Sequence, residues 1–166
     1  MRKAKLLVIK KDYIGDQVIE NVIGYTLDSI FAEHDDILSV NLNMDSYDSI
    51  VHDFYNTQAN INMSKRRRLF HFIISTPLAK DMERTLTEGA ECLVEYFEKL
   101  GHQALLVPHC SSSHNYLNYH WHIAVNAVSS INGKSLTDKY EIYNDIINYL
   151  NANTYAEWSW YYKKPF

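Results

Sequence analysis

The chain has 166 residues, enough for one domain with a substantial core, and its hydrophobic and charged contents of 46% and 22% are ordinary globular values. No apolar run is long enough to span a bilayer, and the short apolar stretch after the basic N-terminus does not predict a signal peptide. Two cysteines do not make a disulfide framework. We expect a single cytoplasmic domain over residues 1–166 with no membrane partner.

The formal net charge of −4 argues against a general nucleic-acid-binding role, because such proteins usually carry a basic excess. The charge is uneven, however, and one compact basic run consists of Lys65, Arg66, Arg67 and Arg68. A local basic patch can bind phosphates even on an acidic protein. The run is therefore a candidate DNA contact, and its alternative interpretation is a solvated loop before a strand.

Hydrophobic periodicity predicts the elements of the first half. Residues 4–10 are expected to form a strand, and residues 17–33 a helix with Asp16 as its N-cap. Residues 35–64 are polar and are expected to form a long loop with one short helix near 47–55. A loop of this length is uncommon in a compact domain and is usually functional or disordered.

The second half alternates between apolar strand-like runs and amphipathic helical segments, and Gly101 is a natural helix terminator. The expected strands are 68–75, 103–109 and 119–128, and the expected helices are 78–100 and 136–152. The aromatic tail, residues 155–166, is expected to dock on the domain. This order predicts an α+β fold: a mainly antiparallel sheet with helices packed on one face and the other face available to a ligand.

Three histidines stand at the ends of two predicted strands. Within the apolar–polar alternation of residues 119–126, His120 and His122 share one face of a strand, and Trp121 lies on the other. His109 ends the preceding strand, so antiparallel pairing would bring it to the other two. Imidazole is the commonest protein metal ligand, and three together predict a metal site with open positions. The alternative is a polar sheet face without an ion.

Several segments together resemble the relaxase, or mobilisation nuclease, family of HUH endonucleases. They are the strand Leu69–Ser75, the strand ending Val107-Pro108-His109, His120-x-His122 with Asn126 and Gly133-Lys134, and Val22-Ile23-Gly24-Tyr25. The resemblance covers most of the chain. It implies a relaxase-type HUH fold (ferredoxin- or RRM-like) in a single nuclease domain.

The resemblance also implies a function. Relaxases nick one DNA strand at a plasmid or mobile-element transfer origin for conjugative mobilisation, acting on single-stranded DNA with accessory mobilisation proteins. A tyrosine attacks the scissile phosphate and becomes joined to the 5′ end. By motif the nucleophile would be Tyr25 and the metal ligands His109, His120 and His122. From their places on the strands, Asn126 is expected to position a ligand or the phosphate, with a strand-end cap as its alternative role. His71 is a candidate to contact DNA or orient a ligand, with a buried, hydrogen-bonded histidine as the alternative.

The chemistry fits this assignment. A phosphodiester is already negative, so a divalent ion assists attack by neutralising charge on its oxygens. A phenol, with a pKa near 10, ionises more easily than an alkyl alcohol. The family works with Mg²⁺ or Mn²⁺, whereas three imidazoles also suit Zn²⁺, Ni²⁺ or Co²⁺.

Alternatives remain open at the sequence level. The commoner relaxase pattern is H-x-H-x-H, and Asn118 stands at its first position here, so His114 is a rival third ligand. Tyr13 is a possible substitute nucleophile. Tyr143 would serve if the chain were an HUH replication initiator or transposase-like nickase, in which the tyrosine follows the histidines. The chain could instead be a catalytically degenerate nucleic-acid-binding domain or an unrelated three-histidine hydrolase.

Overall fold

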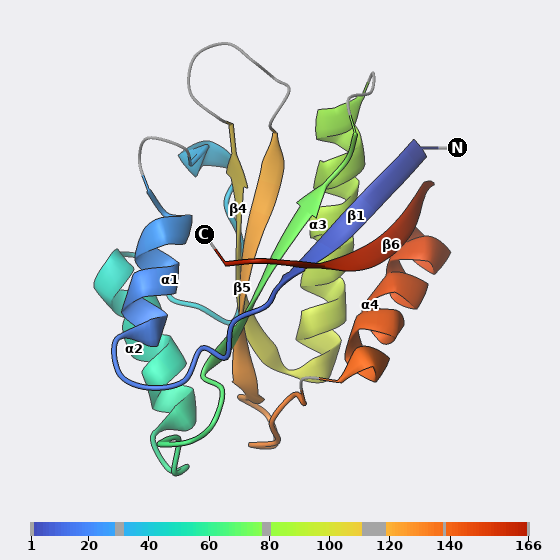
Figure 1. Ribbon diagram of the computed structural model, residues 1–166. Helices are drawn as coiled ribbons and strands as arrows, with labels where there is room; N and C mark the ends of the chain where they lie inside the picture. Colours follow the sequence, from blue (N-terminus) through green and yellow to red (C-terminus); the bar gives the residue numbers. More distant parts are fainter. Residues whose placement is uncertain (1, 29–31, 78–80, 111–118, 138, 166) are drawn as a thin grey trace.

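The computed structural model describes residues 2–28, 32–77, 81–110, 119–137 and 139–165 (Figure 1). The described residues form one six-stranded sheet and four α-helices. In chain order the elements are β1 (Arg2–Ile9), α1 (Val18–Thr26), a short 3-10 helix (His34–Asp36), β2 (Leu38–Val40), α2 (Tyr47–Gln58), β3 (Leu69–Ser75), α3 (Met82–Leu100), β4 (His102–His109), β5 (His120–Ser129), α4 (Tyr140–Asn153) and β6 (Ala156–Lys163).

The strand order in the sheet is β2-β4-β5-β3-β1-β6. All neighbouring strands pair antiparallel except β1 and β6, which pair in parallel at one edge. The innermost strands β3, β4 and β5 are almost completely buried, which explains why their sequences are nearly continuous apolar runs. The few polar side chains on these strands are therefore conspicuous, and most of them lie on one face.

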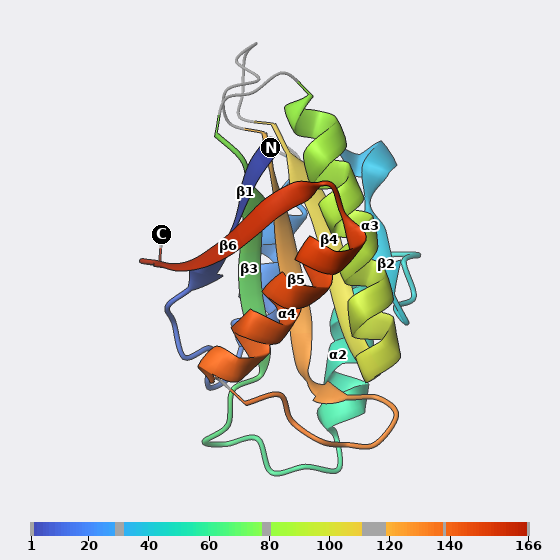
Figure 2. The same ribbon diagram turned by 90° about the vertical axis from the view of Figure 1, so that its right-hand side faces the viewer.

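One face of the sheet is covered by α3 and α4, which lie side by side in both views (Figures 1 and 2). The apolar stripe of α3, which includes Leu86, Leu93 and Phe97, packs on Phe72 and Trp121 of the sheet. Burial of this size is the main favourable contribution to folding of a domain. These two helices form one of the two helical layers that cover the sheet.

The opposite face carries α1 and α2, which lie beside each other over β4 and β5 (Figure 1). Ile23 of α1 and Phe54 of α2 pack against Ile73, Leu105 and Ala124. The sequence predicted a long loop over residues 35–64 with one short helix near 47–55. The segment contains that helix as α2, which runs from Tyr47 to Gln58, and also the unexpected strand β2. The histidine face is therefore only partly available to a ligand.

The architecture is an α+β fold with a mainly antiparallel sheet, which confirms the predicted fold class and is consistent with an HUH relaxase-type domain. Within the described part of the chain, no helix has the length and apolar character needed to cross a bilayer.

Candidate active site

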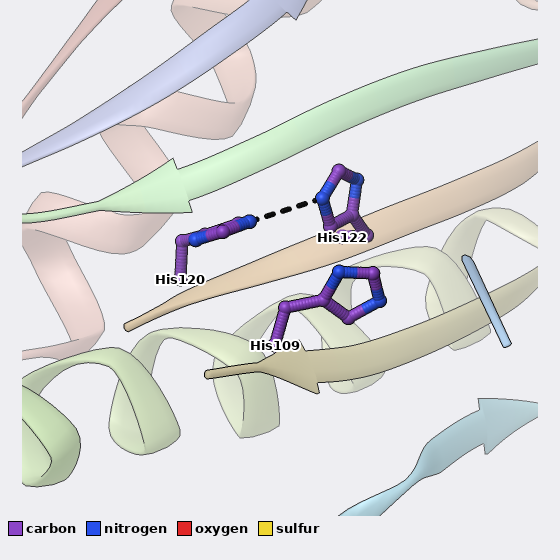
Figure 3. Close-up of side chains that lie close together, drawn as sticks. All are labelled: His109, His120 and His122. Atoms are coloured by element: carbon purple, nitrogen blue, oxygen red, sulfur yellow. Dashed lines mark hydrogen bonds between the residues drawn. The ribbon is translucent and has the colours of Figure 1, made fainter. Parts of the chain in front are cut away.

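Strand pairing gathers the histidines on the face that carries α1 and α2. His109 of β4 stands directly opposite His120 of β5, and His122 lies between Val107 on one side and Ile73 on the other. Directly paired residues project to the same side of a sheet, and so do residues two apart on one strand. The three rings consequently meet at the end of β4 and the beginning of β5 (Figure 3).

The geometry of these rings fits a metal ion. One nitrogen from each of His109, His120 and His122 lies within 4.8 Å of the other two. The Nε2 atoms of His120 and His122 are 3.1 Å apart. Two neighbouring ligands of one ion at about 2.0–2.1 Å stand about 2.9 Å apart in octahedral coordination and about 3.3 Å apart in tetrahedral coordination. Nε2 of His109 bonds the Thr26 carbonyl at 2.7 Å, which leaves Nδ1 of His109 for an ion.

A second layer of side chains orients His122. Nε2 of His71, on β3, is 2.8 Å from Nδ1 of His122, and Nδ1 of His71 is 3.0 Å from the Tyr13 hydroxyl. If Nε2 of His122 binds an ion, its Nδ1 must carry the proton and donate to His71. His71 then donates from Nδ1 to Tyr13. Partners of this kind fix the tautomer and ring orientation of metal-bound histidines.

Burial keeps these imidazoles neutral. His71, His109 and His122 are at most 3% exposed. Burial lowers the pKa of His71 to about 3 and lowers those of His109 and His122 below the ordinary 6.5, and the other histidines of the group lower the pKa of His122 further. A neutral imidazole has the lone pair that a metal ion needs, so His109 and His122 are able to bind an ion at neutral pH.

Tyr25 lies in the last turn of α1, against the histidines. Its ring centroid is 5.1 Å from that of His122 and 6.2 Å from that of His109, and its side chain is 39% exposed. The carbonyl of the next residue, Thr26, is hydrogen-bonded to His109, so the end of α1 is attached to the histidine group. Burial raises the pKa of Tyr25 above 10.0, and the Asp28 carboxylate raises it further. The phenol is therefore protonated at neutral pH.

The other two candidate tyrosines occupy different environments. Tyr13 is 4% exposed, and burial raises its pKa to about 12, so it is placed to support His71 rather than to attack DNA. Tyr143 is fully buried in the core between the sheet and α4, on the face opposite the histidines. Of the three, only Tyr25 combines solvent exposure with contact to the histidine group. His114, the rival third ligand, lies outside the described residues.

The structure does not bring Asn126 to the histidine group. It lies on the same face of β5 but four residues beyond His122, about 13 Å farther along an extended strand. It is fully buried, and its side chain joins α2, β4 and the end of β5. Its Oδ1 accepts from Gln58 and from the Val128 N–H, and its Nδ2 donates to the Phe54 carbonyl and to Gln103. This environment indicates a structural role.

We predict that Asn126→Ala lowers the free energy of unfolding by about 3 kcal/mol, because it leaves several buried polar partners unsatisfied. Urea denaturation followed by circular dichroism measures the change. At a temperature where the variant remains folded, metal binding should be close to that of the wild type. A variant of unchanged stability that had lost nicking activity would instead assign Asn126 to catalysis.

The basic run is divided among different surroundings. Arg68 packs over the Tyr55 ring and donates to Gln58 at 3.1 Å, so it supports α2. Arg67 donates to the Lys11 carbonyl at 2.9 Å. Lys65 and Arg66 are exposed and remain candidates for DNA contact. His71, the fifth predicted DNA contact, is buried beneath the histidine group and is placed to orient His122.

Sequence reasoning missed Lys163 as a neighbour of the site. It ends β6 opposite Ile9, on the histidine face, and its positive charge contributes to lowering the pKa values of His71 and His122. The sequence contains a pattern that indicates the strand β6, because large aromatic residues recur at every second position. They are Trp158, Trp160 and Tyr162, and they alternate with Ser159, Tyr161 and Lys163.

We predict that the metal-free protein loses stability as the pH falls below 6.5. A histidine whose pKa is lower in the folded state than in the unfolded state binds fewer protons when folded. Its contribution is therefore fully present above about pH 6.5 and declines toward the folded pKa, which is about 3 for His71. Each such histidine contributes up to about 1.4 kcal/mol per pH unit.

Chemical denaturation in EDTA at pH 7.5, 6.5 and 5.5 measures this slope, and His71→Gln should reduce it. Equal stability at the three pH values would contradict the burial of neutral histidines.

One known protein family matches most of the chain. The family model described as "Relaxase: MobA/VirD2-like, nuclease domain" matches residues 25–154. The matched region begins at Tyr25 and includes all three histidines of the cluster. No curated protein and no solved structure gives a significant match to the chain.

Proposed function

The chain belongs to the relaxase family of MobA/VirD2-like nucleases, and we propose that it nicks single-stranded DNA at a transfer origin through a covalent bond to Tyr25. The proposal extends to a divalent ion held by His109, His120 and His122, and to the mobilisation of a plasmid or another mobile element by conjugation. Accessory mobilisation proteins would present the origin as single-stranded DNA.

The observation that carries the proposal is the position of Tyr25 against the three histidines. An exposed phenol lies on the same side of the sheet as the three imidazoles, with its ring 5.1 Å from the nearest of them, His122. A phosphodiester entering between the phenol and the ligand group would meet both at once. Holding reactants in this way converts a bimolecular attack into an effectively unimolecular one.

The proposed reaction is a transesterification. The Tyr25 oxygen forms a bond to phosphorus, and the bond from phosphorus to the 3′ oxygen breaks. The phenol gives up its proton, and the departing 3′ oxygen takes up a proton to become a hydroxyl. The 5′ phosphate remains on the enzyme as an aryl diester, which the free 3′ end of a DNA strand can later attack to rejoin the chain.

The residues present fit a divalent ion, as the nitrogen spacing and the lowered pKa values of His109 and His122 indicate. When bound, the ion supplies positive charge that offsets the charge developing on the non-bridging phosphate oxygens. His109, His120 and His122 would hold it, leaving coordination positions for phosphate oxygens. The Tyr25 phenol, whose pKa is raised in the free protein, would ionise more readily beside such a charge. Mg²⁺ or Mn²⁺ is the ion that we propose.

The experiment is a covalent-adduct assay. The protein is incubated with Mn²⁺ and a set of single-stranded oligonucleotides tiled across the DNA that flanks its gene. We expect a protein–DNA species that survives denaturation, disappears with EDTA, and maps to Tyr25 by mass spectrometry. Adduct on Tyr143 would indicate a replication-type nickase, and single-strand binding without any adduct would indicate a degenerate domain.

A further inference from the structure

A hollow lies beyond the C-terminal end of β1, away from the histidine group. It has a volume of about 430 Å³, within the range of about 300–1,000 Å³ that holds small ligands. Its walls come from the β1 end, the segment before β3, the beginning of α4 and the end of β6. The lining residues are Lys10, Lys11, Asp12, Arg67, Tyr140 and Tyr162.

The lining combines positive charge with exposed aromatic rings. Three cations outnumber the one carboxylate, in a protein whose net charge is −4. Tyr140 is 63% exposed and Tyr162 is 43% exposed, and their ring centroids are 6.3 Å apart at a steep angle. The Lys10 ammonium lies 5.5 Å from the centre of the Tyr162 ring. Cations beside exposed rings are the usual composition of sites that hold single-stranded nucleic acid.

The pocket is connected to the histidine group through Lys11 and Tyr13. The Lys11 ammonium lies 5.4 Å from the Tyr13 ring centroid, and the Tyr13 hydroxyl bonds His71 at 3.0 Å. The charge of Lys11 is near enough to contribute to lowering the pKa of His71. Arg67 bonds the Lys11 carbonyl and so fixes this wall of the pocket. The pocket and the histidine group are therefore joined by a short series of side-chain contacts within one domain.

We propose that this pocket binds one nucleotide of the single-stranded DNA that flanks the scissile phosphate, its base against Tyr140 or Tyr162 and its phosphate beside Lys10 and Lys11. The inference rests on the proposed nickase function and adds a defined second contact for its substrate. The beginning of α4 at Tyr140 places the positive end of a helix dipole at the same pocket. Stacking and charge contacts tolerate any base, so the pocket would hold the strand without reading its sequence.

The first test measures binding of fluorescent oligo(dT) by anisotropy. The double variant Lys10→Ala/Tyr140→Ala should weaken binding about 10-fold or more, because one phosphate contact and one stacking platform are lost. Lys10→Ala alone should reduce the slope of log affinity against log salt by about 0.7. The matched control is Lys99→Ala/Tyr155→Ala, which changes the same residue types outside the pocket and should bind like the wild type.

The second test locates the strand directly. Oligonucleotides carrying 5-iodouracil at successive positions are irradiated with the wild-type protein, and cross-links are mapped by mass spectrometry. We expect cross-links to Tyr140 or Tyr162 from a narrow set of positions. The proposal is overturned if the Lys10→Ala/Tyr140→Ala variant binds oligo(dT) as tightly as the wild type, or if the control variant loses as much affinity as it does. This holds even if the Tyr25 adduct forms. Weakened binding in the double variant supports the pocket even if no adduct is found.

Discussion

Replacing Tyr25 with phenylalanine is expected to abolish the covalent adduct, with a rate loss of at least about 10³-fold, while single-stranded DNA binding changes little. Loss of a nucleophile removes the whole covalent pathway, and effects of this size or larger are usual for such residues. The substitution removes one oxygen from a side chain that is 39% exposed, so the fold should be unaffected. Gel separation of the adduct under denaturing conditions, with a labelled oligonucleotide, measures the change.

Tyr143→Phe is the matched control for this variant. It makes the same chemical change in a fully buried ring on the other side of the sheet, and it should leave the adduct intact. Tyr13→Phe removes a hydrogen bond to His71 and should reduce the rate without eliminating the adduct. An adduct that persisted in Tyr25→Phe and vanished in Tyr13→Phe would reverse the assignment of the nucleophile.

The strands and helices with strong periodicity were predictable from the sequence. The expected strand 103–109 and helix 78–100 correspond closely to β4 and α3, and α3 ends before Gly101, whose φ is 75°. The edge strands β2 and β6 were missed because edge strands are short or half-exposed and lack a buried apolar run. The short helix expected near 47–55 corresponds to α2, but α2 buries only Ile50, Phe54 and Gln58, so the weak periodicity of this polar segment did not define its full length.

The site could be predicted in part, because the H-x-H spacing places two rings on one face whatever the register. Convergence of His109 with them depends on the β4–β5 register, which only tertiary pairing fixes. Asn126 lies on the same face of β5, but it is four residues beyond His122 along the strand and therefore does not reach the histidine rings. The role of His71 was also unresolved, since sequence alone cannot show that it lies beneath His122 with Tyr13 behind it.

The second large effect is expected for His120→Ala. His120 is the only partly exposed member of the ligand group, so its removal creates little buried cavity and should leave the protein folded. We expect the affinity for Mn²⁺ to fall at least about 100-fold and the adduct to be lost. Replacing a residue that only hydrogen-bonds a metal ligand typically costs about 10- to 100-fold, so a larger loss indicates a ligand. Isothermal titration calorimetry measures the affinity, and thermal unfolding in EDTA verifies the fold.

Two substitutions of His71 test whether it supports metal binding by holding His122 in place, without binding the ion itself. His71→Gln retains a carbonyl oxygen that can accept from Nδ1 of His122, whereas His71→Phe offers no acceptor and leaves that donor buried. The Phe variant should lose about 10- to 100-fold in Mn²⁺ affinity, and the Gln variant should recover part of that loss. Equal affinities for both variants and the wild type would mean that the hydrogen bond between His71 and His122 does not support metal binding.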